Sequence, residues 1–273
     1  MPGGFSFARV AAMITRYVYL MRSSWPRLMD LIYWPLVQML TWGFLQTYLL
    51  QAPQGGAGAR GLGFAAGALI GAMLLWDILF RGQLGFSVSF LEEMWSRNIA
   101  NIMMSPLRPA EFILSLMAMS LVRLAIGMVP VSLLAIVFFG FNLWGLGLAL
   151  AAFFANLIFT SWAIGLFCSG LVLRYGLAAE SMVWTIMFLL QPLACVFYPV
   201  TTLPKWLQAI AWALPPTYVF EGLRALLNQH VLRLDLMAEA FAINIVLFST
   251  AVFLFFGLLR AAQRAGTLLQ TGE

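Results

Sequence analysis

Long apolar runs recur along this chain from about residue 30 to about residue 260, separated by short polar stretches. Each run has about 20 residues or more, the length that a helix needs to cross the hydrocarbon core of a bilayer. Charged residues make up only 9% of the chain, too few for the surface of a water-soluble domain, which carries about 25%. A membrane barrel would instead show segments of about ten alternating residues, and none are visible. The sequence therefore predicts an all-α integral membrane protein, with residues 1–273 forming a single transmembrane domain.

The apolar runs predict six transmembrane helices, at about 30–51, 62–89, 110–140, 146–173, 179–200 and 236–260. Residues 201–230 are also apolar, but three prolines divide them into halves of about 11–14 residues, too short to cross a bilayer. We therefore expect a re-entrant helix pair at 203–228, between spans five and six, with its broken backbone satisfied by protein or water. Residues 5–27 predict an N-terminal interfacial amphipathic helix, because Arg9 and Arg16 lie two turns apart, opposite an apolar stripe. Its basic face is expected to meet lipid headgroups.

The positions of the basic residues predict the orientation in the membrane. With the N-terminus inside, ten of the fifteen basic residues fall on the inner side and four on the outer side, while Arg123 lies within a span. Both termini are then expected to be cytoplasmic, which agrees with an even number of spans. Fourteen of the fifteen are arginine, a composition that suggests a GC-rich bacterial genome, so the predicted location is a bacterial inner (plasma) membrane.

Several classes of function lack the residues that they need. Basic residues lie singly at span ends rather than in a patch, which argues against binding to nucleic acid. Cys168 and Cys195 lie within apolar runs and His230 is the only histidine, so no metal site is predicted. The only lysine, Lys205, is followed by Trp206, so the chain has no P-loop that could bind a nucleotide. No catalytic cluster is visible either, and we expect neither an enzyme nor a cofactor bound to this chain.

The most charged segment, residues 90–112, predicts a short helix at 91–104 on the cytoplasmic side. Two glutamates are expected to open this helix, and Arg97 follows the second of them by four positions on the same face. Such a helix is either a solvated connector that lies on the membrane or a coupling element that inserts into a soluble partner. Its charged residues are Glu92, Glu93 and Arg97, and Ile99 and Ile102 belong to an apolar stripe by which it could dock.

Three charged residues fall inside predicted spans, where an unpaired charge is costly. Asp77 and Arg81 are separated by four positions on the second span and are expected to form an ion pair. Arg123 lies about 13 residues into the third span, at nearly the same predicted depth as Asp77, so these two side chains are expected to pair between adjacent helices. Structural pairing is the favoured role, and contact with a substrate is the alternative.

Two motifs resemble the type-2 permease family of ATP-binding-cassette (ABC) transporters. The first, EEMWSRNIANIMMSPLRPAEF at 92–112, is similar to the coupling-helix region of that family. The second, YPVTTLPKWLQAIAWALPPTYVFEGLRALL at 198–227, is similar to its Tyr-Pro, Leu-Pro and Leu-Pro-x-Thr-Tyr-x-x-Glu-x-x-Arg pattern. The interfacial first helix and the six-span layout also match, so the resemblance covers essentially the whole chain.

The resemblance implies the permease subunit of an exporter, working as a homodimer with two copies of a separate ATPase subunit that binds ATP and Mg. Residues 91–104 would dock on that ATPase, with Glu92, Glu93 and Arg97 as the polar contacts. The helices at 203–228 would close the outer end of the pathway. The residues that match the second motif and are candidates for an outer gate are Thr217, Tyr218, Glu221 and Arg224. The implied cargo is an amphipathic drug, lipid or lipid-linked glycan. The alternatives are a secondary carrier, for which Asp77 is the only candidate titratable site within the membrane, and a membrane-embedded lipid-modifying protein.

Overall fold

A computed structural model describes residues 4–51 and 67–265 of the chain, and all regular structure in these two ranges is helical. The helices are α1 (Phe7–Arg22), α2 (Trp25–Gln51), α3 (Ala68–Trp95), α4 (Ile99–Met104), α5 (Pro109–Phe139), α6 (Leu148–Tyr175), α7 (Met182–Leu193), α8 (Lys205–Trp212), α9 (Pro215–Gln229) and α10 (Leu234–Ala265). Short 3-10 turns lie at Leu143–Leu146, Gly176–Ala179 and Val200–Thr202. The prediction of an all-α protein is confirmed.

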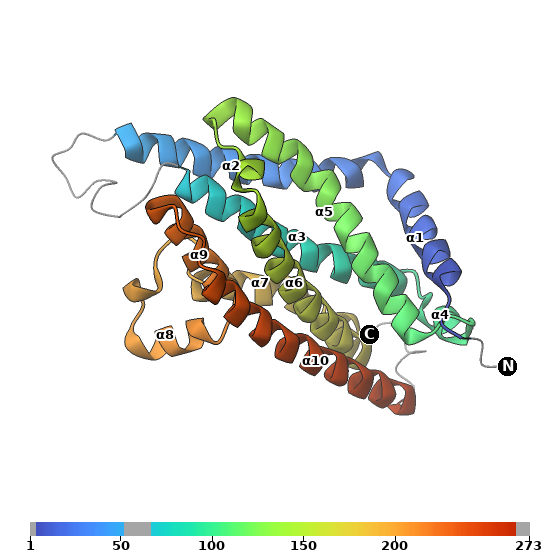
Figure 1. Ribbon diagram of the computed structural model, residues 1–273. Coiled ribbons are helices and arrows are strands. Elements are labelled where there is room, and N and C mark those ends of the chain that lie inside the picture. Colours follow the sequence, from blue (N-terminus) through green and yellow to red (C-terminus); the bar gives the residue numbers. More distant parts are fainter. Residues whose placement is uncertain (1–3, 52–66, 266–273) are drawn as a thin grey trace.

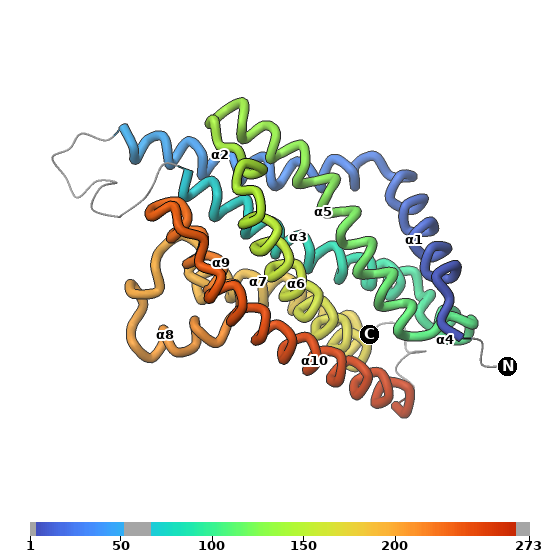
Figure 2. The backbone as a smooth tube through the Cα atoms, viewed as in Figure 1, coloured from blue at the N-terminus to red at the C-terminus, as the bar shows by residue number. Residues whose placement is uncertain are grey.

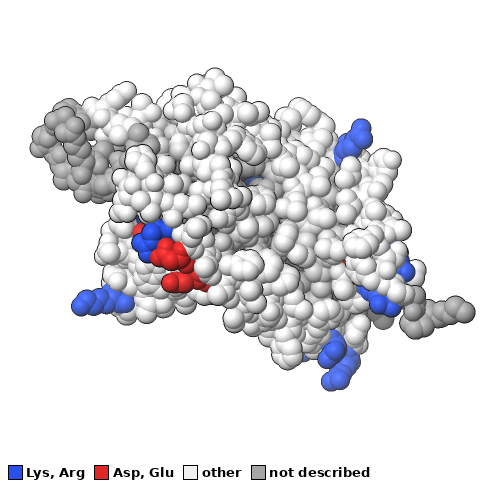
Figure 3. Space-filling view, in the orientation of Figure 1, with Lys and Arg blue, Asp and Glu red and all other residues white. Residues whose placement is uncertain are grey.

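The long helices form an elongated bundle with distinct ends (Figures 1 and 2). Helices α1 and α4 lie at one end, and α8 and α9 lie at the other. Helix α3 is the central element: its most apolar stretch is 89% buried, whereas that of α10 is only 22% buried. On the face shown in Figure 3, charged side chains gather toward the two ends and nearly all of the middle is uncharged. This distribution suits a protein whose middle lies in hydrocarbon.

Four helices of the described part of the chain are long and apolar enough to span a membrane: α3, α5, α6 with the turn that follows it, and α10. Helix α2 has 27 residues but is less apolar, because tryptophan, tyrosine, glutamine and threonine interrupt it. Helix α7 has 12 residues and reaches about 18 Å at 1.5 Å per residue, less than the roughly 30 Å of the hydrocarbon core. The fold therefore contains fewer obvious spans than the six expected.

The expected fifth span at 179–200 is shorter in the structure, where α7 ends at Leu193. The chain turns immediately afterwards, since Cys195 adopts a left-handed conformation with φ of 53°. The hydroxyl of Tyr198 donates a hydrogen bond to the carbonyl oxygen of Pro192 at 2.8 Å, and the backbone amide of Cys195 donates to the same oxygen at 3.3 Å. Apolar content does not signal the local turn that these bonds stabilise.

The segment with three prolines forms two short helices, as expected from its sequence. Helix α8 has 8 residues and α9 has 15, and Pro215 begins α9 at a position where a missing N–H is tolerated. Helix α9 packs against α10, α6 and α3, and its N-terminal half, through Leu223, is largely buried.

Polar and small residues join the long helices. Thr160 of α6 donates to the side-chain oxygen of Asn244 of α10 at 2.7 Å, and the Asn244 amide donates to the carbonyl oxygen of Asn156 at 3.0 Å. Hydrogen bonds of this kind stabilise contacts between helices in membranes. A Cβ at Gly127 of α5 would lie only 2.5 Å from the carbonyl oxygen of Leu31 of α2, so this glycine lets the two helices approach closely.

Candidate functional site

The chain reverses direction between α3 and α4 in a tight turn. Arg97 adopts a left-handed conformation with φ of 55°, and the amide of Asn98 donates to the carbonyl oxygen of Glu93 at 2.9 Å. We call residues 95–106 the α3–α4 corner. The prediction that Glu92 and Glu93 open a helix is wrong, because both lie in the last turn of α3 and the break comes after them. Acidic side chains are unfavourable at a helix C-terminus, so these two need cationic partners.

Glu93 finds that partner on α1. Its side chain is fully buried, and both terminal nitrogens of Arg16 donate to its two carboxylate oxygens. The side-chain amide of Asn98 adds a third hydrogen bond at 2.8 Å. Hydrogen bonding to this carboxylate raises the pKa of Arg16, and burial raises the pKa of the neighbouring Tyr17 phenol. The expected pairing of Glu93 with Arg97 is absent from the described ion pairs, because the left-handed turn carries Arg97 away from the helix face.

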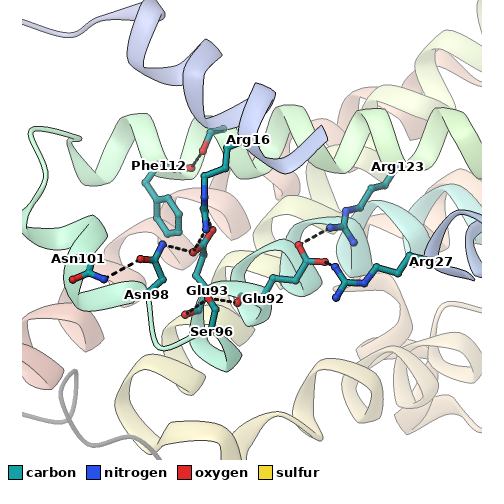
Figure 4. A network of polar contacts seen from close by, with 10 residues as sticks. Arg16, Arg27, Glu92, Glu93, Ser96, Asn98, Asn101, Phe112 and Arg123 are labelled. Carbon is teal, nitrogen blue, oxygen red and sulfur yellow. Dashed lines mark hydrogen bonds and ion pairs between the residues drawn. The ribbon is translucent and has the colours of Figure 1, made fainter. Parts of the chain in front are cut away.

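Glu92 binds two other helices, as Figure 4 shows. Nη2 of Arg123 on α5 donates to one carboxylate oxygen at 2.9 Å, and Nη1 of Arg27 on α2 lies 3.4 Å from the other. Two adjacent glutamates on α3 therefore bind arginines from three different helices, α1, α2 and α5.

The predicted pairing of Arg123 with Asp77 is wrong, and helix geometry explains why. Asp77 lies 18 residues, or about 27 Å, from the C-terminal end of α3. Arg123 lies only 14 residues, or about 21 Å, from the N-terminal end of α5, so the two residues are not level. Helical side chains also tilt toward the N-terminus of their own helix. Because α3 and α5 run in opposite directions, these tilts separate the two side chains, and Arg123 points toward Glu92 instead (Figure 4). The Asp77–Arg81 pair is present, with Nε of Arg81 donating at 2.8 Å.

A third acid also binds α1. The side chain of Glu111 at the start of α5 is fully buried and accepts from Arg9 at 2.8 and 2.5 Å. It also accepts from the backbone amides of Ser6 and Arg108. Arg9 and Arg16, which were expected to meet lipid headgroups, thus also form ion pairs with acids of the bundle, which the sequence did not predict. The two-turn spacing of these arginines matches two acids that are more than 75 positions away in sequence.

Of the five predicted contact residues at the α3–α4 corner, only Arg97 is exposed. Ile99 and Ile102 are buried in the core of this same chain, so the apolar stripe of α4 holds the corner against its own bundle. The side chains that face outward belong to the other side of the corner. They are Trp95, Ser96, Arg97, Asn101, Met104, Ser105 and Pro106.

At the opposite end, the predicted gate residues separate into two environments. Glu221 accepts from the amide of Val200 at 2.8 Å and from Nη2 of Arg224 at 3.1 Å, and this ion pair lines a cavity of about 610 Å³. Thr217 is fully buried, and its hydroxyl has no hydrogen-bond partner among the described residues. The ring of Tyr218 packs edge-to-face on Trp212 at 4.9 Å. The described residues contain no group of three metal-ligating side chains, here or elsewhere.

Comparison with known proteins identifies this architecture. Residues 12–228 match the model of a protein family described as ABC-2 type transporter, and this range includes both motifs on which the resemblance was based. No curated protein shows significant similarity to the chain. The family match confirms the resemblance.

Proposed function

Because this chain belongs to the ABC-2 type transporter family, we propose that it forms the translocation pathway of an exporter for an amphipathic substrate. As a member, it is a multi-pass membrane permease that itself lacks ATPase activity, and such permeases pair with ABC ATPase subunits. The proposed cargo is a drug, a lipid or a lipid-linked glycan. We further propose a homodimer of this chain with two ATPase copies, in a bacterial inner membrane and with both termini in the cytoplasm.

The observation that carries this proposal is the ion-pair network behind the α3–α4 corner. The corner exposes Arg97, Asn101 and Met104, which an ATPase subunit could contact, while Glu92 and Glu93 directly behind it bind arginines of α1, α2 and α5. A displacement of the corner is therefore transmitted to three helices by charged hydrogen bonds rather than by apolar contact alone. This is the arrangement expected of an element that couples ATP hydrolysis in a partner to movement of a pathway.

The remaining architecture follows from the same proposal. Helices α2 and α7 would be the first and fifth of six membrane crossings. In α2 the side chain of Gln46 is buried against α3, and α7 would reach the far side with the turn after it. Helices α8 and α9 would enter one leaflet and return as the outer gate. In that gate the Glu221–Arg224 ion pair would hold the closed conformation, and Thr217 and Tyr218 would pack behind it.

Co-purification of this chain with its ABC ATPase subunit tests the proposal. We expect Arg97→Glu to reduce the recovered ATPase at least tenfold, because it reverses an exposed charge at the corner without touching the buried network. The matched control is Lys205→Glu, which makes the same charge change on α8 at the opposite end of the molecule and should leave recovery unchanged. Glu93→Arg is unsuitable, since it would place a second cation beside Arg16 in a buried site. Transport by this chain in proteoliposomes without any ATPase would refute the proposal.

A further inference from the structure

A cavity of about 460 Å³ opens between α2, α3 and α5, behind the α3–α4 corner. It is separate from the cavity at the α8–α9 end, and it shares one residue, Trp95, with the exposed surface of the corner. Its lining combines charged side chains with apolar ones from the same three helices. The charged residues are Arg27, Asp30, Arg81, Glu92 and Arg123, and the main apolar ones are Leu31, Leu84, Val88 and Trp95.

The three arginines keep donors available for a further partner. Each is held by an acid through one nitrogen: Arg81 by Asp77, and Arg27 and Arg123 by Glu92. A guanidinium has five N–H donors, so within the described part of the chain most of them have no protein acceptor. The Arg123 side chain is only 9% exposed, and its buried Nε has no acceptor among the described residues. A buried donor without an acceptor is costly, which points to an acceptor supplied by a ligand.

The free donors of the cavity select the kind of ligand. Three arginines and two acids line it, and Asp77 pairs with Arg81 beside the lining, so the cluster is neutral as a whole and attracts an anion through its free N–H donors rather than through net charge. Arginine binds phosphate oxygens with two parallel hydrogen bonds, and basic cavities between membrane helices recognise lipid headgroups. The apolar side chains of Leu31, Leu84 and Val88 in the same cavity suit an acyl chain rather than a free ion. A singly charged phosphodiester that carries acyl chains meets both requirements.

We propose that this cavity binds the phosphate group of a lipid, with Arg81 and Arg123 as its main donors and Arg27 at the entrance. The bound lipid contributes the acceptor that Arg123 lacks, and its chains extend along the apolar lining. This inference rests on insertion of the chain in a membrane and does not depend on export or on docking of an ATPase.

Native mass spectrometry of the full-length chain in detergent tests the inference with three probes: dioctanoyl phosphatidylglycerol, dioctanoylglycerol, which lacks the phosphate, and inorganic phosphate. We expect a saturable phosphatidylglycerol adduct, no adduct with dioctanoylglycerol, and no displacement of the lipid by inorganic phosphate at equal concentration. Arg81→Gln and Arg123→Gln should each weaken binding about tenfold, since each removes charged hydrogen bonds. Arg260→Gln, which makes the same charge change on an exposed residue of α10, should not.

Val88→Trp provides a test that leaves every charge in place. It fills part of the cavity from the α3 side and should also weaken phosphatidylglycerol binding about tenfold or more, even if a charge variant fails to fold. Equal binding by the native chain, Arg123→Gln and Val88→Trp would overturn the inference, as would an equal loss in Arg260→Gln. Displacement of the lipid by inorganic phosphate would overturn the assignment to a lipid and identify a site for the free anion.

Discussion

Replacing Glu93 by glutamine tests whether the buried ion pair between α3 and α1 holds the corner in place. The substitution keeps the size of the side chain and one acceptor oxygen, so the hydrogen bond from Asn98 can persist. It removes the negative charge that faces Arg16, whose two terminal nitrogens both donate to this carboxylate. The change therefore isolates the charge on one fully buried side chain.

The structure bounds the size of the effect. Breaking a buried ion pair costs about 3–5 kcal/mol, because the remaining charge stays buried without a partner, whereas an exposed pair contributes about 0–1 kcal/mol. Here the Glu93 side chain has no exposure but that of Arg16 is 38% exposed, so the arginine can turn toward water after the substitution. We therefore expect a loss of about 2 kcal/mol in the free energy of unfolding, between the two limits. That loss corresponds to a fall of about 4–8 °C in the melting temperature.

Thermal unfolding of the purified chain in detergent, followed by size-exclusion chromatography with fluorescence detection, measures this shift. The matched control is Glu239→Gln, the same substitution at an exposed position of α10, which should change stability by less than about 0.5 kcal/mol. Combining Glu93→Gln with Arg16→Gln closes a double-mutant cycle, and the coupling between the two sites should be about 1–2 kcal/mol. Equal melting temperatures for the two glutamine variants, or strict additivity in the cycle, would refute the reasoning.

Three further predictions concern packing and access. Gly127→Ala should lower the free energy of unfolding by about 1–3 kcal/mol, because the new Cβ would lie 2.5 Å from a backbone oxygen of α2. Thermal unfolding should show no such loss for the control Gly257→Ala, since that glycine has open space around it. Asn244→Leu should cost about 1–2 kcal/mol by removing the hydrogen bonds between α6 and α10, and an unchanged melting temperature would contradict this. Cys168 and Cys195 are fully buried, so a maleimide should label them only after denaturation in sodium dodecyl sulfate, and rapid labelling of the folded chain would disprove the burial.

Composition and apolar periodicity were enough to predict a helical membrane protein, its N-terminal amphipathic helix and the two short helices at the prolines. These features depend on local sequence, because prolines and uninterrupted apolar runs act on the residues near them. The two boundaries that differ from the prediction have different causes. Helix α7 ends early at a local turn in which Cys195 is left-handed, a conformation that apolar content does not signal. Helix α3 continues past its apolar run, where arginines of other helices neutralise its last turn.

The site was predicted less well than the fold, and Arg123 shows the reason. Counting residues from assumed span ends placed it level with Asp77, but α3 extends to Trp95 and both side chains tilt toward the start of their own helices. Spacing within one helix did predict the Asp77–Arg81 pair, for which the partners are four residues apart. No pattern in a single sequence shows that Arg9 and Arg16 are partners of Glu111 and Glu93, because that requires knowing which helices are neighbours.

Glu92 belongs both to the corner network and to the proposed lipid cavity, and this links the two proposals. Its carboxylate binds Arg123 and Arg27, which are also donors that line the cavity. A phosphate that draws either arginine toward itself weakens a bond that holds the end of α3 to α5 or α2. By thermodynamic reciprocity, a partner that displaces the corner must then change the affinity of the cavity for the lipid by the same factor. Lipid binding measured with and without the ATPase therefore reports on this coupling, and equal affinities would show that the corner and the cavity act independently.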